Sequence, residues 1–226
     1  MCDSLPYSYK PEVSGETALF HYQKNIFPQE YANEIKHWLD NLELKAGKCI
    51  SGKEVPRLQL WFQECNKYFC EVWKYRYPRW ESEPYPDILS IFQTKIIDIA
   101  QGAINDHPEF TFPDINSALI NKYRDGNDSI RAHRDTPDSF GEYPTILVYS
   151  TGATRQMKIK KIIYDCDNFA SLRGDEDTSY DKVFDLEDNS LFIMAGASQK
   201  YFTHEILKSD TSENRYSITF REYLYK

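Results

Sequence analysis

The sequence lacks any apolar run long enough to cross a lipid bilayer. Its longest apolar stretches, such as LFIMAGA at residues 191–197, fall far short of the roughly 20 residues that a membrane-spanning helix needs. The first residues, MCDSLPYSYKPEVSGE, contain neither the basic n-region nor the apolar h-region of a secretory signal. We therefore expect an intracellular protein, cytoplasmic or nuclear, that is not inserted in a membrane.

Cysteines with metal-binding spacing are also lacking. The five cysteines are odd in number and irregularly placed, which favours reduced thiols of an intracellular protein over a disulfide framework. The segment CNKYFC at residues 65–70 has no second cysteine or histidine pair nearby, so the spacing does not indicate a zinc site.

The chain has no excess of positive charge. Its 27 basic and 35 acidic residues give a net charge of −8, which argues against binding nucleic acid by charge alone. The charge is uneven, because residues 53–80 and 155–161 are locally basic and residues 165–181 are strongly acidic. We expect the acidic run to be a solvated loop that lies away from any binding pocket.

The chain does have enough apolar and aromatic residues for a substantial core. Its 226 residues, 41% hydrophobic and 15% aromatic, suit one large domain, 1–226. Apolar residues at helical spacing predict one helix over residues 28–44 and a second over residues 86–104. From about residue 117, short runs alternate apolar and polar residues between turn-forming residues, which is typical of antiparallel strands.

These patterns predict an α+β domain that is mainly β, a sandwich or jelly roll. Residues 1–116 are expected to supply N-terminal helices that pack on one sheet. The aromatic, proline-containing segment between the helices is expected to form loops and short edge strands. Residues 117–226 are expected to form the β core.

The last predicted strand, RYSITFREY, has two different faces. Its apolar side chains alternate with a set that holds two arginines and two hydroxyls but no acid. That polar set would be an ordinary solvated face if it pointed outward. Pointing into a jelly roll, it would make a pocket for a dicarboxylate, because the arginine fork matches a carboxylate. The polar set is Arg215, Ser217, Thr219 and Arg221.

His133 and Asp135 form a His-x-Asp pair, but such pairs arise by chance in a chain this acidic. His107 and Glu109 have the same spacing. A second candidate ligand, His204, lies far along the chain and shortly before the arginine-bearing strand. Two imidazoles and one carboxylate on one side of a metal ion leave three positions open, an arrangement typical of non-haem Fe(II) oxygenases.

The order Asn-x-Tyr, His-x-Asp, His and Arg-x-x-x-Thr-x-Arg resembles the AlkB family of Fe(II)/2-oxoglutarate dioxygenases. The matching segments are INKYRDGNDSIRAHRD, SLFIMAGASQKYFTHEI and RYSITFR. VPRLQLWFQE at residues 55–64 resembles the start of the nucleotide-recognition lid in animal members that act on nucleic acid. The resemblance implies a double-stranded β-helix (jelly roll) and a lid at about residues 53–80. It also implies Fe(II), 2-oxoglutarate and O2 as cofactors.

The resemblance also implies roles for individual residues. Arg215 would pair with the distal carboxylate of 2-oxoglutarate, with the Tyr123 hydroxyl beside it. Arg221 would pair with the proximal carboxylate, with Asn121 beside it. Ser217 would also contact the cosubstrate, although the family usually has asparagine there. The implied ligands of the iron are His133, Asp135 and His204.

The implied activity is oxidative demethylation of N-alkylated bases in DNA or RNA, with release of formaldehyde, succinate and carbon dioxide. Residues 57–80 interleave basic and aromatic side chains, which suits phosphate contact and stacking on an extruded base. The alternative for these aromatics is packing against the helices. Arg155, Lys158 and Lys160 could follow a nucleic-acid backbone on another side. The candidate substrate-binding residues are Arg57, Trp61, Phe62, Tyr75, Tyr77 and Lys158.

The small number of basic residues predicts only about two to four phosphate contacts. Base stacking would therefore supply much of the affinity for nucleic acid. That balance favours a single-stranded or locally melted methylated nucleic acid, and we expect the protein to be a monomer. The alternative activity is hydroxylation of a protein side chain or a small molecule on the same iron scaffold. The net charge of −8 favours this alternative, as do Ser217 and Pro137, which stands where repair members carry an acid. The lid resemblance and the local basic patches oppose it.

Overall fold

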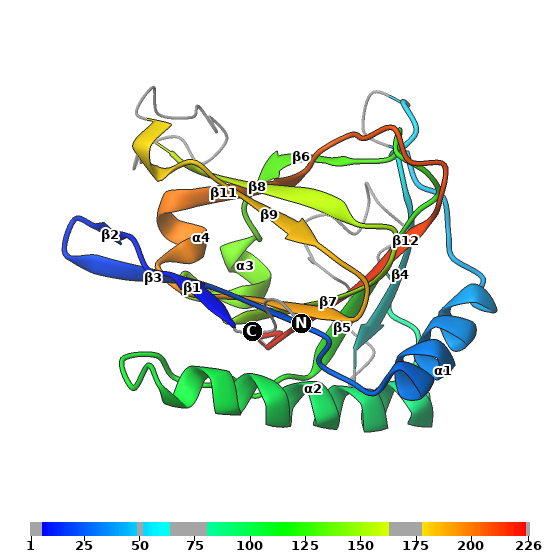
Figure 1. Ribbon diagram of the computed structural model, residues 1–226, viewed down its shortest axis with the longest axis horizontal. Coiled ribbons are helices and arrows are strands. Elements are labelled where there is room, and N and C mark those ends of the chain that lie inside the picture. The colour runs from blue at the N-terminus through cyan, green and yellow to red at the C-terminus, as the bar shows by residue number, and fades with distance from the viewer. Residues whose placement is uncertain (1–5, 49–51, 64–80, 163–177, 225–226) are drawn as a thin grey trace.

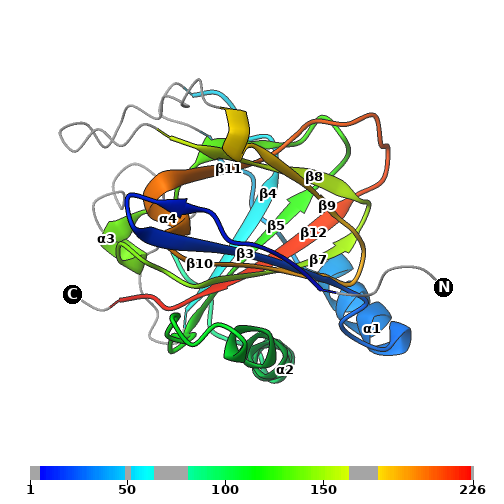
Figure 2. The same ribbon diagram turned by 60° about the vertical axis from the view of Figure 1, so that its left-hand side comes forward.

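The computed structural model describes residues 6–48, 52–63, 81–162 and 178–224. Two antiparallel sheets face each other, and two long helices cover the outer face of the larger sheet (Figure 1). Figure 2 shows the same layers after a rotation, with α2 below the large sheet. The helices are α1 (Gln29–Asp40), α2 (Asp87–Asn105), α3 (Pro137–Phe140), α4 (Ser198–Tyr201) and the short 3-10 helix η3 (Thr178–Tyr180).

Within these residues the larger sheet has eight strands and the smaller sheet has four. The larger sheet runs in the order β1-β3-β10-β7-β12-β5-β4, with β2 paired to β3, and the smaller in the order β6-β11-β8-β9. The larger sheet contains β1 (Tyr7–Tyr9), β2 (Glu12–Val13), β3 (Glu16–Lys24), β4 (Leu58–Gln63), β5 (Ser117–Tyr123), β7 (Ile146–Gly152), β10 (Ser190–Gly196) and β12 (Arg215–Arg221). The smaller contains β6 (Ile130–His133), β8 (Arg155–Lys161), β9 (Lys182–Leu186) and β11 (Phe202–Ile206).

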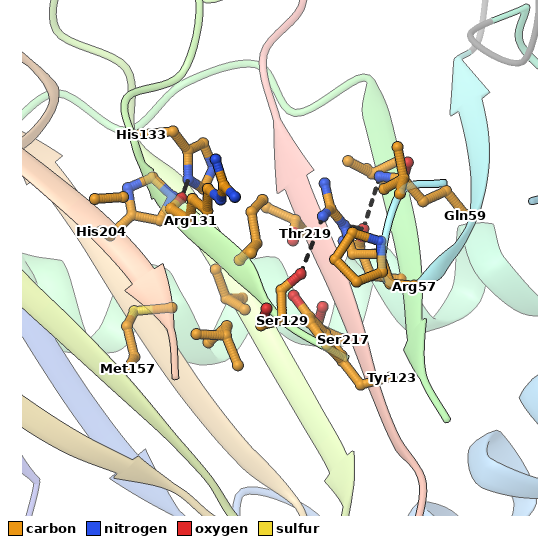
Figure 3. Close-up of a pocket in the computed structure, with 18 of the residues that line it drawn as sticks. Arg57, Gln59, Tyr123, Ser129, Arg131, His133, Met157, His204, Ser217 and Thr219 are labelled. Carbon is orange, nitrogen blue, oxygen red and sulfur yellow. Dashed lines mark hydrogen bonds between the residues drawn. The ribbon is translucent and has the colours of Figure 1, made fainter. Parts of the chain in front are cut away.

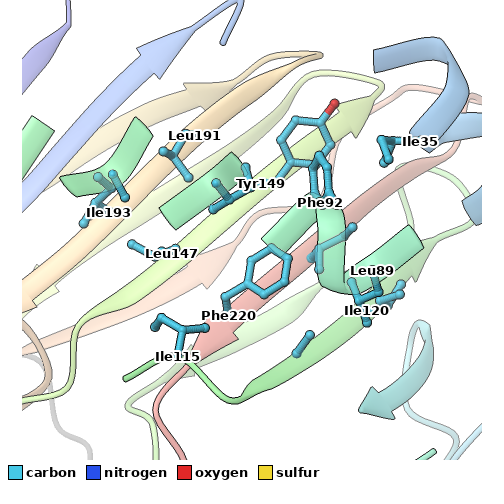
Figure 4. Packing of buried hydrophobic residues seen from close by; sticks show 14 of the residues in the cluster. Ile35, Leu89, Phe92, Ile115, Ile120, Leu147, Tyr149, Leu191, Ile193 and Phe220 are labelled. Carbon is cyan, nitrogen blue, oxygen red and sulfur yellow. The ribbon is translucent and has the colours of Figure 1, made fainter. Parts of the chain in front are cut away.

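The fold prediction, mainly β with a jelly-roll arrangement and helices on one sheet, is confirmed. The helix predicted over residues 86–104 is α2, which packs an apolar stripe against the large sheet. Phe92 of α2 lies 4.9 Å from the Tyr149 ring and 6.1 Å from the Phe220 ring, centroid to centroid (Figure 4). Full burial of each such side chain stabilises the fold by about 1.5–3 kcal/mol.

Strand β12 sits at the centre of this arrangement. Its apolar residues Tyr216, Ile218 and Phe220 belong to the core under the helices. The alternate residues from Arg215 to Arg221 point into the space between the two sheets, where they line a cavity. The inward orientation of the polar face, one of two left open by the sequence, is therefore the observed one.

The N-terminal half contributes more to the sheets than the sequence pattern predicts. Strand β3, which follows no alternation, lies between β1 and β10 in the large sheet, and β4 forms its far edge. Five successive residues of β3, 18–22, are buried, so both of its faces are covered and an alternating pattern is absent. The β core therefore begins well before residue 117.

Two smaller features also differ from the sequence pattern. In the alternating region after residue 117, residues 199–206 are not one strand but are divided between the single turn of α4 and strand β11. His133 ends the short strand β6, which lies in a polar segment without clear alternation. No helix in the described part of the chain combines the length and the apolar character needed to cross a membrane.

Candidate active site

The antiparallel pairing of β6 with β11 brings two distant histidines together. His133 and His204 are direct partners in this ladder, and their ring centroids lie 4.2 Å apart. Asp135 follows two residues after His133, and its backbone N–H donates to Oε1 of Gln199 at 2.9 Å. One potential ligand atom from each of His133, Asp135 and His204 lies within 4.8 Å of the others. Sequence reasoning selected these three residues, and the fold brings them together.

Both imidazoles are neutral, which is the protonation state that binds metal ions, and a hydrogen bond also orients the ring of His133. His133 Nδ1 lies 2.9 Å from the Arg131 carbonyl, which can only accept, so Nδ1 carries the proton and Nε2 is free to ligate. Burial lowers the pKa of His133. Burial and the neighbouring His133 lower the pKa of His204 to about 3. Both rings are therefore neutral near pH 7, as ligation requires.

Asp135 is fixed in its charged form by Arg221. Arg221 Nε donates to Oδ2 of Asp135, and both side chains are 5% exposed. Burial alone would raise the pKa of Asp135, but the charges of Arg221, His204 and His133 and the hydrogen bond from Arg221 together outweigh it, and the pKa is lowered. Within the described residues, Nη1 of Arg221 has no hydrogen-bond partner. That nitrogen could still pair with a bound anion.

Strands β5 and β12 place the other predicted residues side by side. Arg215 lies directly opposite Tyr123 in the ladder, and Ser217 lies opposite Asn121. The Arg215 guanidinium is 1% exposed, donates from Nη2 to Ser150 Oγ at 2.7 Å, and lies 5.1 Å from the centre of the Tyr123 ring. Its Nε and Nη1 have no partner among the described residues. A buried guanidinium with two unpaired nitrogens is costly, so this geometry suits an anionic ligand.

A cavity of about 760 Å³ joins the histidine cluster to the arginine pocket. Figure 3 shows His133 and His204 on one side of it and Arg57 and Gln59 on the other. Arg57 donates from Nε to Asn121 Oδ1 at 3.0 Å and from Nη1 to the Ser129 carbonyl at 3.3 Å. Arg57 lines the cavity, and its role in substrate binding stays a prediction.

Two other predicted substrate contacts are placed in the core instead. Trp61 is fully buried, with its ring 6.4 Å from Phe140 and 6.2 Å from Tyr223. Phe62 is 4% exposed and belongs to the apolar cluster under the helices. Neither ring is open for stacking on a base, because the β4 edge strand is covered on both faces. Tyr75 and Tyr77 lie outside the described residues.

The basic run on β8 does not reach the cavity. Lys158 pairs with Asp181 at 3.1 Å and Lys160 with Glu205 at 3.6 Å, on the face of β8 opposite the cavity-lining Met157. Arg155 points to the other face, where its guanidinium is buried and donates to the backbone carbonyls of Asp125, Asp128 and Leu207. Strand alternation separates Arg155 from Lys158 and Lys160, so these residues form no common stripe. The acidic run ends at residue 181, but residues 165–177 lie outside the described part.

Gln199 is a residue that sequence reasoning missed. Its Oε1 accepts from the Asp135 N–H at 2.9 Å, and its Nε2 donates to Met194 Sδ at 3.5 Å. The side chain is 5% exposed and joins the turn that carries Asp135 to α4, which leads directly into β11 and His204. A single glutamine in a short helix carries no motif, so only the folded structure reveals this contact.

The second His-x-acid pair is placed elsewhere. His107 lies near Lys10, whose Nζ is 3.3 Å from its Nδ1 and 3.6 Å from Glu109 Oε1. In the part of the chain that the structure describes, the cluster around His133 is the one group of three or more histidine, cysteine or acidic side chains close enough to share a metal ion.

Comparisons with known proteins agree with this geometry. The 2OG-Fe(II) oxygenase superfamily matches residues 18–221. "Alpha-ketoglutarate-dependent dioxygenase alkB homolog 3" of Rattus norvegicus is 34% identical over 168 residues, which cover 74% of this chain and 50% of that protein. The Homo sapiens protein of the same name is 33% identical over 168 residues, 74% of this chain and 51% of that protein. The chain thus spans about half the length of these relatives.

Two further similarities are more distant. "DNA oxidative demethylase ALKBH2" of Arabidopsis thaliana is 27% identical over 127 residues, 47% of this chain and 37% of that protein. The solved structure of OsALKBH1 matches 90% of this chain and 97% of its own with a TM-score of 0.61 and 14% identity, a likeness of fold alone. Because the superfamily match spans most of the chain and includes every residue of the histidine cluster and the arginine strand, the chain belongs to the 2OG-Fe(II) oxygenase superfamily, and within it is similar to the AlkB homologues.

Proposed function

We propose that the protein is an Fe(II)/2-oxoglutarate-dependent dioxygenase that oxidatively demethylates N-alkylated bases in DNA or RNA. The observation that carries this proposal is the joining of two sites in one cavity. His133, Asp135 and His204 offer ligand atoms within 4.8 Å of one another. The same cavity contains Arg215, a buried guanidinium with two unpaired nitrogens. A metal ion and a dicarboxylate would satisfy both sets of groups.

The residues present fit both cofactors. Two neutral imidazoles and one carboxylate form the facial set typical of non-haem Fe(II) oxygenases and leave positions open for cosubstrate and oxygen. For 2-oxoglutarate, Arg215 and Tyr123 would hold the distal carboxylate, with the hydroxyl of Ser217 nearby. The unpaired Nη1 of Arg221, together with Asn121, would face the proximal carboxylate.

When Fe(II), 2-oxoglutarate and O2 are bound, they supply the oxidation that releases an N-methyl group as formaldehyde, with succinate and carbon dioxide. The chain's own residues position the reactants. Arg221 keeps Asp135 charged and oriented, and Gln199 fixes the backbone of the same residue. The apolar walls of Leu119, Val148 and Ile206 would limit the water around the reacting groups.

Methylated nucleic acid is the proposed substrate, and the name of the Arabidopsis thaliana relative supports it. Arg57 at the cavity would contact the substrate, and residues 53–80 would form the lid, with Tyr75 and Tyr77 for stacking. The small number of basic residues favours a single-stranded or locally melted strand and a protein that acts as a monomer. We place its action in the nucleus or cytoplasm, where nucleic acid is found.

The test is a panel of methylated single-stranded oligonucleotides incubated with the protein, Fe(II), 2-oxoglutarate and ascorbate. Mass spectrometry of the oligonucleotides should show loss of a methyl group that requires both Fe(II) and 2-oxoglutarate. The His204→Ala variant should leave every oligonucleotide unchanged. If 2-oxoglutarate is consumed while no methylated oligonucleotide is altered, the demethylase proposal fails, and a protein or small-molecule hydroxylase takes its place.

A further inference from the structure

The two segments that carry the candidate metal ligands meet at α4, a helix of four residues. Strand β11 follows α4 directly and carries His204. Two hydrogen bonds join α4 to the other segment. Gln199 Oε1 accepts from the Asp135 N–H at 2.9 Å, and the Lys200 carbonyl accepts from Arg134 Nη1 at 3.1 Å. The position of α4 therefore bears on how Asp135 lies relative to His204.

A single helical turn does not hold its own position. Isolated helices shorter than about 12 residues are marginal in water. Ala197 at the N-cap makes no side-chain hydrogen bond, and alanine is a poor capping residue. The turn lies between β11 of the small sheet and β3 of the large sheet (Figures 1 and 2). Backbone hydrogen bonds fix its two ends, from the Ala197 N–H to the Thr17 carbonyl and from the Ile162 N–H to the Tyr201 carbonyl.

Side chains hold α4 to the large sheet through one carboxylate, that of Glu16 at the start of β3. Glu16 accepts hydrogen bonds from the hydroxyl of Tyr143, at 2.5 Å, and from that of Tyr201. Lys200 Nζ lies 2.9 Å from Glu16 Oε2 and 2.6 Å from the Tyr143 hydroxyl. We call these four residues the Glu16 cluster. Two of them, Lys200 and Tyr201, belong to α4, so the turn is attached to β3 by two of its side chains.

The Glu16 cluster is charged across the physiological pH range. Hydrogen bonds from the other three members, that of Tyr143 foremost, lower the pKa of Glu16 to about 2. Lys200 Nζ also lies 3.2 Å from Glu142 Oε1. The Lys200 side chain is 16% exposed, and its hydrogen bonds to charged partners are stronger than neutral ones. The cluster therefore differs from an isolated surface ion pair, which contributes little.

The Glu16 cluster lies outside the catalytic cavity. Among the described residues that line that cavity there is no member of the cluster. The cluster can therefore act on the metal centre only through α4. That path is short, because the Lys200 side chain reaches Glu16 while the Lys200 carbonyl and the neighbouring Gln199 contact the segment that carries Asp135.

We propose that Lys200 is a positioning residue of the metal centre. Its ion pair with Glu16 holds α4 against β3, and α4 in turn holds Asp135 and His204 at the separation that a shared metal ion requires. Metal affinity depends on the groups that orient the ligands as well as on the ligands themselves. This inference rests on the metal centre of the proposed function, and it gives a role to a residue outside the cavity.

The test titrates the protein with Co(II) alone, a redox-stable substitute for Fe(II), and follows the visible absorption of the bound ion. Lys200→Met keeps the apolar stem and removes the charge. Coulomb's law alone predicts tighter binding of a divalent cation when a nearby positive charge is removed. Positioning predicts the opposite, a fall in Co(II) affinity of about three- to tenfold, less than the loss of a direct partner of a ligand causes. The spectrum at saturation should also change. Equal or tighter binding by Lys200→Met would overturn the proposal.

The matched control is Lys24→Met. Lys24 pairs with Glu187 at the opposite end of β3, so this variant loses the same charge and the same kind of ion pair. It should keep the Co(II) affinity and spectrum of the wild type, while urea denaturation shows similar small losses of stability in both variants. Lys200→Arg keeps the charge and should retain most of the affinity. Weakening by Lys24→Met as large as that by Lys200→Met would contradict the proposal.

A second variant decides the matter if Lys200→Met does not fold. Glu16→Gln removes the other partner of the ion pair and should weaken Co(II) binding, whereas Glu187→Gln, which loses the same charge, should not. Equal Co(II) affinities in these two variants would overturn the role of the Glu16 cluster. A wild type that binds no Co(II) would remove the metal centre, and with it the proposed function. A wild type that binds Co(II) no more tightly than Lys200→Met would overturn this inference alone.

Discussion

The catalytic half of the cavity differs in construction from three cations that also line it, Arg57, Arg131 and Lys208, which we call the rim. Strand pairing assembles the catalytic half. His133 lies opposite His204 in the pairing of β6 with β11, and Arg215 lies opposite Tyr123 in the pairing of β12 with β5. The rim has no common strand, since its residues come from before β4, from β6 and from after β11. Strand pairing holds the side chains of the catalytic half in one arrangement, which suits a single cosubstrate. The rim can change residue by residue without disturbing the sheets, so substrate choice is expected to reside there.

The largest expected effect breaks the catalytic half. His133→Ala and His204→Ala should each remove measurable 2-oxoglutarate turnover and bound iron, because two remaining ligands do not hold the metal. Iron content by absorption spectroscopy and succinate formation are the measurements. His107→Ala is the matched control, since it alters the other His-x-acid pair and should keep both. Loss of iron in His107→Ala but not in His133→Ala would reverse the assignment.

The second prediction concerns Trp61, which lies near the rim in sequence but belongs to the core. Trp61→Ala should lower the free energy of unfolding by about 3–5 kcal/mol, because a fully buried ring leaves a cavity. Urea denaturation measures this loss, and Trp61→Phe should cost less. If Trp61→Ala keeps the stability of the wild type but no longer binds oligonucleotides, Trp61 contacts the substrate rather than stabilising the core.

The third prediction separates binding from folding at Arg215. Arg215→Ala should raise the 2-oxoglutarate concentration needed for half-maximal turnover at least tenfold, since a charge-assisted pair contributes about 1.5–3 kcal/mol. The melting temperature without 2-oxoglutarate should hardly fall, because two guanidinium nitrogens are unpaired in that state. The rise in melting temperature on adding 2-oxoglutarate should disappear. If Arg215→Ala is unfolded both with and without 2-oxoglutarate, Arg215 is needed for folding rather than for binding the cosubstrate.

A smaller effect is expected from Gln199. Gln199→Leu removes the acceptor for the Asp135 N–H. It should weaken iron affinity by about tenfold, an effect typical of losing a group that orients a metal ligand by a hydrogen bond. Gln199→Glu keeps an acceptor and should retain more of the affinity. Lys208→Gln, a change at the rim, should leave iron affinity as it is. Equal iron affinity in wild type and Gln199→Leu would show that this contact does not position Asp135.

The catalytic half was largely predictable because its residues follow strand periodicity. Arg215 and Arg221 share a face with Ser217 at every second position, and Asn121 and Tyr123 do the same on β5. The pairing of β6 with β11 could not be read from the sequence, since His133 ends a strand of four residues within a polar segment. The family resemblance, rather than periodicity, joined His133 to His204.

The substrate-binding residues were less predictable for several physical reasons. An aromatic residue on an edge strand has the same pattern whether it packs inward or faces solvent, and Trp61 packs inward. Lys158 was a misreading that alternation could have prevented, because a residue next to Met157 on a strand must face away from it. The convergence of Arg57, Arg131 and Lys208 depends on three loops and strand ends, for which no sequence spacing exists.

The central claim, that this cavity couples 2-oxoglutarate oxidation to demethylation of a base, is tested most directly by product stoichiometry. Formaldehyde, succinate and demethylated oligonucleotide are measured together in one reaction with a methylated single strand. The account predicts equal amounts of the three, and none of them from His204→Ala. Succinate formed at the same rate with methylated and unmethylated strands, without formaldehyde, would contradict it.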